Sequence, residues 1–442
     1  MQKTYTITTL GCKVNQSESE SIGRQLDRLR LAPVARGEKA DICIINTCTV
    51  TGKAAMQSRQ AVRRAIRRHP GAQVIVTGCY AEIEPEALRA ISGVDDVIGH
   101  GGKSGIPRMV EALLGMEPLP VSSDSLSDPG LESVPFPKGD VGGRSRPFLK
   151  IQDGCNSACS YCIVPHARGR SRSIHPQTVL YNVVQLAQRG YHEVVLTGIH
   201  IGQYGLDLSP TNSLTGLMGL LNSLDSAPRI RLSSIEPAEL SDGIIQLIAA
   251  SDRFCRHLHI PLQSGDDQIL RRMQRPYGRD AYRQLVLKVK ERLPDAAVGA
   301  DVLIGFPGES DAAYQNTYDL VAGLPLSYLH VFPFSPREGT PAYRYPGRVP
   351  DAVVKERCRL LRELGSMKRR AFHRALLGST AEIILEDRHD STRKPLRGMT
   401  SNYIPVYVKK DTVAPEHRRQ RHALIGVRLD NLVMEGVSGT VL

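Results

Sequence analysis

The sequence has no tryptophan, and aromatic residues make up only 5% of its 442 residues. So few aromatic side chains argue against an extensive surface on which nucleic-acid bases stack. No apolar run approaches the roughly 18–20 residues of a membrane-spanning helix. The opening residues also lack the charged head and apolar core of a secretion signal. We therefore expect a cytoplasmic protein without a membrane segment.

Cysteine is scarce as well: the chain has nine, and three of them fall within residues 155–162. This number is too low and too uneven for a disulfide scaffold, whereas clustered thiols in a cytosolic chain more often bind metal or carry out redox chemistry. No C-x-x-C pair accompanies the first β-type runs, which argues against a disulfide oxidoreductase. The formal charge of +12 favours a polyanionic partner such as nucleic acid.

Three β-type runs open the chain, and each ends in a cysteine: 5–12, 41–48 and 73–79. Helical patterns separate them, so we expect βαβ units in a doubly wound parallel sheet. Ligands gather at the carboxyl ends of such strands. Cys12, Cys48 and Cys79 should therefore converge, although free cysteines at buried strand ends can also be plain core residues.

Six further β-type runs alternate with helical patterns in the middle of the chain, at 148–154, 193–202, 229–237, 256–265, 297–309 and 326–336. This recurrence predicts a parallel βα barrel or part of one, with its chemistry on the loops after the strands. A basic helix near 350–374 follows, and then short β-type runs that predict a small all-β barrel of about 70 residues.

These patterns divide the chain into four parts. We expect an N-terminal domain at 1–115, a linker rich in Pro, Ser and Gly at 116–143, a barrel core at 144–371 and the all-β module at 372–442. The fold class is therefore α/β with a small C-terminal β-barrel.

The most specific motif is C-x3-C-x2-C, formed by Cys155, Cys159 and Cys162 just after the first barrel strand. Three thiolates on one loop can bind three irons of a 4Fe–4S cluster and leave the fourth iron open for chemistry. The alternative is a closed zinc site with His166 as the fourth ligand, but such sites usually pair two ligand couplets.

This motif, with Tyr161 before the last cysteine, resembles the radical S-adenosylmethionine (SAM) enzymes. The resemblance implies that the open iron binds the amino and carboxylate groups of SAM. It also implies that one electron from the cluster cleaves the sulfonium and releases a 5′-deoxyadenosyl radical. The later strand ends match the cofactor contacts of that family, which here are Thr197, Gly198, Ser234, Glu236, Gln263 and Gly305.

The segments GCKVNQSES, NTCTV and GCY ahead of such a core resemble the methylthiotransferases. The resemblance implies a second 4Fe–4S cluster, held by Cys12, Cys48 and Cys79, that delivers sulfur. One SAM would supply the methyl group and another the radical. Cys43 lies in the middle of a β-type run and should be a core residue. The C-terminal module resembles the RNA-binding TRAM barrel.

The substrate is suggested by residues 11–16, GCKVNQ, which resemble the branch that modifies C2 of N6-threonylcarbamoyladenosine next to the tRNA anticodon. Arg170 departs from this branch, which more often has proline there. The alternatives are isopentenyladenosine tRNA or a ribosomal-protein aspartate, and, in another class, a zinc-stabilised RNA-binding protein without catalysis. The implied partners are tRNA, SAM, a low-potential electron donor and a sulfur source.

Two groups of basic residues are candidates for RNA contacts, since Lys and Arg bind phosphates without reading sequence. The first would form one face of a helix: Arg59, Arg63, Arg64, Arg67 and Arg68. The second comprises Lys368, Arg369, Arg370, Arg374, Lys409, Lys410, Arg418, Arg419 and Arg421. The alternative for the first group is an ordinary solvated helix face.

Overall fold

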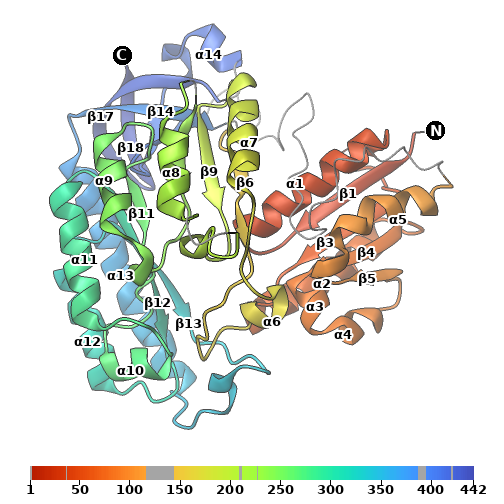
Figure 1. Ribbon diagram of the computed structural model, residues 1–442, viewed down its shortest axis with the longest axis horizontal. Helices are drawn as coiled ribbons and strands as arrows, with labels where there is room; N and C mark the ends of the chain where they lie inside the picture. Colours follow the sequence, from red (N-terminus) through yellow and green to blue (C-terminus); the bar gives the residue numbers. More distant parts are fainter. Residues whose placement is uncertain are drawn as a thin grey trace.

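The computed structural model describes residues 2–35, 37–115, 144–208, 212–225, 227–386, 395–419 and 422–442. They form an N-terminal α/β unit, a central set of parallel strands with helices outside it, and a small C-terminal β-barrel (Figure 1). The fold class expected from the sequence is therefore confirmed. The expected linker, 116–143, lies outside the described residues.

The N-terminal sheet is parallel, with its strands in the order β2-β1-β3-β4-β5. These strands are β1 (Thr4–Thr9), β2 (Ala32–Pro33), β3 (Ile42–Thr47), β4 (Gln73–Gly78) and β5 (Asp96–Ile98). One face packs on α1 (Lys13–Arg28) and α5 (Ile106–Leu113), and the other packs on α2 (Gly52–Arg68). Every residue of β3 is buried because helices cover both faces of the sheet.

The central barrel is open and built from six parallel strands. They are β6 (Phe148–Lys150), β9 (Glu193–Thr197), β10 (Arg229–Leu232), β11 (His257–His259), β12 (Ala297–Ile304) and β13 (Tyr328–Pro333). Two three-stranded sheets, β10-β9-β6 and β11-β12-β13, are linked by a parallel bridge between Ile230 and Phe254. The outer helices are α7 (Pro176–Gln188), α8 (Leu214–Asn222), α9 (Asp242–Ala250), α11 (Arg279–Arg292), α12 (Asp311–Gly323) and α13 (Asp351–Ala375).

Side chains alternate along each barrel strand between the helices and the barrel interior. On β9, Val194 and Leu196 belong to the apolar core under the helices, so Val195 and Thr197 face the interior. The same alternation directs charged side chains inward, among them Arg231 on β10 and Asp301 on β12. The interior of the barrel is therefore polar, unlike the fully packed core beneath its helices.

The C-terminal module is a closed barrel with the strand order β14-β15-β16-β18-β17. Its strands are β14 (Thr380–Glu386), β15 (Leu396–Thr400), β16 (Pro405–Val408), β17 (Leu424–Val433) and β18 (Gly436–Val441), and a short α14 (Pro415–Arg419) lies between β16 and β17. The strand Leu396–Thr400 shows no clear β-type pattern in the sequence, because LRGMT carries arginine and glycine inside it.

The turn between β15 and β16 docks on the central barrel at the amino ends of its strands. Arg231 donates hydrogen bonds to the carbonyl oxygens of Ser401 and Thr400, at 2.9 and 3.0 Å. Arg229 donates to the carbonyl oxygen of Met399 at 3.0 Å. The C-terminal barrel thus closes the end of the central barrel opposite the cysteine loop.

Candidate functional site: two groups of cysteines

The C-x3-C-x2-C segment forms one loop after β7 (Gln152–Asp153). Gly154 has φ +73°, and a Cβ there would overlap the carbonyl oxygen of Arg170, so only glycine fits. The loop returns through α6 (Val164–Arg168) to β8 (Arg172–Ser173), which pairs with β7. All three cysteines of the loop line one open cavity of about 860 Å³.

Polar groups surround the thiols of this loop. His200 Nδ1 lies 3.2 Å from Cys155 Sγ, and Arg275 donates to Cys159 Sγ at 3.2 Å. Burial opposes ionisation of Cys155, but the hydrogen bonds from His200 and Ser157 outweigh it and lower the pKa of this thiol. Burial raises the pKa of Cys162 to about 12. A bound metal must therefore displace the proton of Cys162.

The N-terminal cysteines converge at one edge of the sheet, because the strands end level. Pairing of Thr9 with Asn46 and of Thr47 with Gly78 aligns β1, β3 and β4. Cys12 is the N-cap of α1, Cys48 follows β3, and Cys79 begins α3 (Cys79–Ile83).

These three thiols influence one another electrostatically. The pKa of Cys48 is raised to about 11 by burial and by the charges of Cys79 and Cys12. Gly11, at φ +96°, leaves room beside Cys48: a Cβ there would lie 3.0 Å from the sulfur of Cys48. Cys43 lies in the apolar core between the sheet and α2, apart from this group, as a core residue would.

The spacing of the sulfurs bears on which metal they could hold. A zinc ion bound at 2.3 Å by tetrahedral thiolates brings its sulfurs within about 3.8 Å of each other. Among the described residues, the only group whose ligand atoms lie within 4.8 Å of one another is His259, Asp301 and His330. The two cysteine groups are spread more widely, as they must be when each thiol binds a different iron of a cluster.

Arg168 connects the two cysteine groups. It is buried, and it donates to Asp153 Oδ1 at 2.7 Å, two residues before Cys155, and to Glu18 Oε1 at 2.9 Å on α1. Its other nitrogen donates to Asn15 Oδ1, three residues after Cys12. One guanidinium thus ties the first turns of α1 to the start of the cysteine loop of the barrel.

More buried charges extend this network to Cys79. Lys103 pairs with Glu18 at 2.5 Å and lies 3.3 Å from His100, whose Nε2 is 3.5 Å from Cys79 Sγ. Burial works against ionisation of Glu18, but Arg168, Lys103 and Lys150 hold its pKa well below the ordinary value. The N-terminal cysteines therefore lie beside a buried, paired ionic network.

Comparisons with known proteins agree with this geometry. Residues 4–99 match the model described as "Uncharacterized protein family UPF0004", and residues 149–321 match the Radical SAM superfamily. The threonylcarbamoyladenosine tRNA methylthiotransferase MtaB of Bacillus subtilis (strain 168) is 38% identical over 416 residues, which are 92% of this chain and 90% of the relative. The chain belongs to the tRNA methylthiotransferase family. MtaB of Aquifex aeolicus (strain VF5) is 35% identical and covers 90% of this chain and 95% of the relative.

Further matches of this methylthiotransferase include a relative with a different named substrate and solved structures of similar fold. A tRNA-2-methylthio-N(6)-dimethylallyladenosine synthase of Moorella thermoacetica (strain ATCC 39073 / JCM 9320) is 32% identical over 90% of both chains. Among solved structures, the radical SAM methyltransferase TsrM of Kitasatospora setae has a TM-score of 0.55 at 15% identity, covering 78% of this chain and 74% of that one. This structural likeness shows the fold alone.

Family membership confirms the resemblance stated from the sequence, including its threonylcarbamoyladenosine branch. The methylthiotransferase is an enzyme that uses SAM and 4Fe–4S clusters. The alternative of a zinc-stabilised protein without catalysis is therefore excluded. Among the described residues, no helix combines the length and apolar character needed to cross a membrane.

The residues expected to contact SAM lie at carboxyl ends of the barrel strands. Thr197 ends β9, and Gly198 packs so tightly on Gln152 that a Cβ would lie 2.8 Å from its side-chain oxygen. Glu236 forms an ion pair with Arg275, the residue that also donates to Cys159. The structure therefore brings Glu236 beside the cysteine loop.

The other three expected contacts have different surroundings. Ser234 Oγ and His259 Nδ1 share a hydrogen bond of 2.6 Å inside the barrel. Gln263 adopts φ +64° and forms a backbone bridge to Val302. Gly305 lies against Val354 of α13, where a side chain would not fit. The role of each in binding SAM remains a prediction.

Three residues around the cysteine loop of the methylthiotransferase were missed from the sequence. His200 contacts Cys155 and also pairs with Glu239 at 2.7 Å, while Arg275 contacts Cys159. Arg275 lies 116 residues from Cys159, so no local pattern connects them. His200 follows Thr197 by three residues, and its place on the loop after a barrel strand could have marked it.

The basic groups expected to meet RNA are only partly free. On α2, Arg63, Arg64, Arg67 and Arg68 are exposed, whereas Arg59 hydrogen-bonds Tyr80. In the second group, Lys368 donates to the carbonyl oxygens of Ala322 and Leu324 at the end of α12, so its charge stabilises a helix terminus. Arg421 and the side chain of Arg419 lie outside the described part of the chain.

Proposed function

We propose that this protein inserts a methylthio group at C2 of N6-threonylcarbamoyladenosine in tRNA, giving 2-methylthio-N6-threonylcarbamoyladenosine. The observation that carries the proposal is the convergence of two cysteine groups, one on a barrel loop and one at a sheet edge, joined by buried Arg168. The relatives named MtaB, which match over 90% or more of this chain, support the choice of substrate.

We assign the radical-generating cluster to Cys155, Cys159 and Cys162. With SAM on its open iron, such a cluster supplies the electron that cleaves the sulfonium, so that a C–H bond of the substrate can be opened. Arg275 donates to Cys159, and His200 shares a hydrogen bond with Cys155; both contacts would orient these thiols as ligands. Glu236, paired with Arg275, would accept hydrogen bonds from the SAM that binds beside it.

The second cluster belongs to Cys12, Cys48 and Cys79 and would supply the sulfur of the methylthio group. Its three thiols come from separate strand ends, so this cluster forms only when the N-terminal sheet is folded. Cys48 and Cys79 are buried and Cys12 is exposed, which leaves one side of the group open to substrate. The electron and the replacement sulfur come from an external donor and an external sulfur source.

The remaining parts of the chain would hold the tRNA. The exposed arginines of α2 and the C-terminal barrel at 372–442 offer phosphate contacts, while 1–115 and 144–371 carry the two clusters on either side of the reacting base. Because the substrate is tRNA, we place the protein in the cytoplasm.

Nucleoside analysis of tRNA tests the substrate. A strain that lacks the gene should accumulate threonylcarbamoyladenosine and lose its methylthio form. An unchanged threonylcarbamoyladenosine pool with a loss of the methylthio form of dimethylallyladenosine would overturn this choice and favour the activity named for the Moorella relative.

Iron content tests the assignment of the cysteines. Anaerobically purified protein should carry about eight irons per chain. The triple Cys155/Cys159/Cys162→Ala variant should retain about four and lose all activity. A variant that keeps its full iron content would refute this placement of the cluster.

A further inference from the structure

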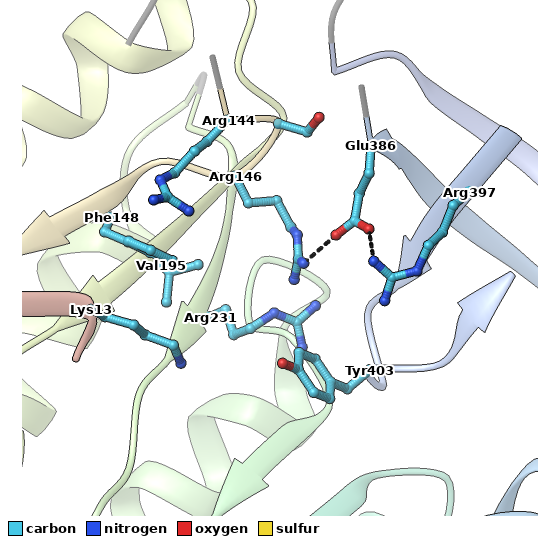
Figure 2. Close-up of a pocket in the computed structure, with 10 residues that line it drawn as sticks. Lys13, Arg144, Arg146, Phe148, Val195, Arg231, Glu386, Arg397 and Tyr403 are labelled. Atoms are coloured by element: carbon cyan, nitrogen blue, oxygen red, sulfur yellow. Dashed lines mark hydrogen bonds and ion pairs between the residues drawn. The ribbon is translucent and has the colours of Figure 1, made fainter. Parts of the chain in front are cut away.

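A second cavity, of about 300 Å³, lies where the N-terminal domain, the central barrel and the C-terminal barrel meet. Figure 2 shows its side chains, several of which direct nitrogen atoms toward a common space. Five of the lining residues are cationic and one is acidic: Lys13, Arg144, Arg146, Arg231, Arg397 and Glu386. A cavity of this composition attracts an anion.

Most of these charges are already paired. Glu386 accepts from Arg146 at 2.5 Å and also from Arg397 (Figure 2). Arg231 pairs at 2.7 Å with Glu193, a fully buried residue of β9. These ion pairs restrain the arginines, of which Arg231 alone is fully buried, and the ring of Tyr403 is stacked 5.3 Å from the Arg231 guanidinium.

Lys13 is the exception. Its side chain is partly buried and lines the cavity, and within the described part of the chain it has no hydrogen-bond or ion-pair partner. Burying a cation without a partner is costly, and an anion in the cavity would remove that cost. Lys13 also directly follows Cys12, so the cavity adjoins the group of cysteines that we assign to sulfur delivery.

The position of the cavity suits one end of the proposed substrate. Val195, which lines the cavity, precedes Thr197 on β9 by two residues, or about 7 Å along the strand. Thr197 lies at the strand end where SAM is expected. The threonylcarbamoyl group carries a free carboxylate four bonds beyond N6 of adenine, a reach of about 5 Å. A base held near Thr197 would therefore bring this carboxylate toward the cationic cavity.

We propose that this cavity binds the carboxylate of the threonylcarbamoyl group, with Lys13 as the free donor and Arg146 and Arg231 as its fixed neighbours. The inference rests on the proposed function and identifies its specificity determinant. A dimethylallyl group carries no charge and would leave Lys13 unpartnered. A backbone phosphate of the same RNA offers similar anionic chemistry, and the experiment separates the two.

The test measures binding of anticodon stem-loops to the full chain by fluorescence anisotropy. Three stem-loops are compared: one with threonylcarbamoyladenosine, one with its methyl ester and one with unmodified adenosine. The wild type should bind the free carboxylate at least tenfold more tightly than the ester, as expected for one charge-assisted hydrogen bond. Lys13→Met should lose this tenfold preference, and Lys13→Arg should restore most of it.

The control is Lys288→Met, which removes an exposed lysine on the outer helix α11 and should behave like the wild type. Iron content of each preparation shows whether Lys13→Met disturbs the neighbouring Cys12. If it does, Arg397→Gln, on the C-terminal barrel, provides the independent variant and should weaken the same preference.

Two results would overturn the inference. Equal binding of the free acid and the ester by the wild type would show that no carboxylate is recognised. An equal loss for all three stem-loops in Lys13→Met would assign the cavity to a backbone phosphate. Failure of the proposed function is distinguishable, because it would appear in the nucleoside analysis while the comparison of acid with ester still decides what the cavity binds.

Discussion

Replacing Arg168 with methionine tests whether the buried ionic network holds the two cysteine-bearing domains together. Methionine has a similar length but no charge, so the substitution removes the hydrogen bonds to Asp153, Glu18 and Asn15 without leaving a large hole. The side chain of Arg168 is only 1% exposed, so water cannot take its place.

The expected loss of stability follows from the two carboxylates, Asp153 and Glu18, that would lose Arg168 as a partner. Among the described residues, Asp153 would keep only its ion pair with Lys150, at 3.5 Å, while Glu18 would keep Lys103 at 2.5 Å and Lys150 at 3.4 Å. Breaking one partner out of a buried ion pair costs about 3–5 kcal/mol. We expect the free energy of unfolding at pH 7 to fall by about that amount.

The difference should depend on pH in a defined direction. In the wild type, the lowered pKa of Glu18 contributes stability that is present above the ordinary carboxyl pKa and is lost as the pH falls through the lowered value. In the variant, Glu18 is still buried but no longer pairs with Arg168, so its negative charge is less favourable. Protonation of Glu18 at low pH removes this unfavourable charge. The difference in unfolding free energy between the wild type and Arg168→Met should therefore become smaller as the pH falls below about 4.3.

Urea denaturation followed by circular dichroism measures the loss, with Arg283→Met, an exposed arginine on α11, as the matched control. The Arg168→Met variant should also form less methylthio product than the wild type, because Arg168 no longer fixes α1 against the cysteine loop. An unfolding free energy within about 0.5 kcal/mol of the control would refute the structural role given to this guanidinium.

Three further predictions concern the cysteines and the RNA surface. Gly154→Ala should lower the iron content by about four, since its Cβ would overlap a carbonyl oxygen and its φ is positive; full iron content would contradict this. Cys43→Ala should keep all its iron and lose about 1 kcal/mol of stability, whereas loss of iron would make Cys43 a ligand. The double variant Arg63→Met/Arg64→Met should weaken tRNA binding. The slope of log affinity against log salt concentration should also become shallower, by the equivalent of up to about two phosphate contacts. An unchanged slope would mean that this part of α2 is an ordinary solvated helix face.

Much of the fold could be predicted because the apolar β-type runs of the sequence form strands in the structure. All nine principal strands of the first two domains coincide with runs visible in the sequence, and the level ends of parallel strands predicted where Cys12, Cys48 and Cys79 would meet. The short strands β2 (AP) and β5 (DVI) could not be predicted, because neither lies within a longer β-type run of the sequence.

The ionic network could not be predicted. Glu18 and Arg168 are 150 residues apart, and each looks in the sequence like one more charged residue of a solvated helix. Only the tertiary fold places them together, because a buried charge is recognisable by its partners and not by its neighbours in the chain. The same holds for Arg231, which lies in a short strand and meets carbonyl groups 169 and 170 residues away.

Docking of the β15–β16 turn on Arg229 and Arg231 makes the C-terminal barrel less modular than its separate fold suggests. A truncation before residue 372 would expose the amino ends of β10 and strip Arg231 of two carbonyl acceptors. Chimeras that exchange this barrel between relatives should therefore transplant residues 396–408 together with their arginine partners. Without these matching contacts, the exchanged barrel would be covalently linked to the enzyme but would not dock on the central barrel.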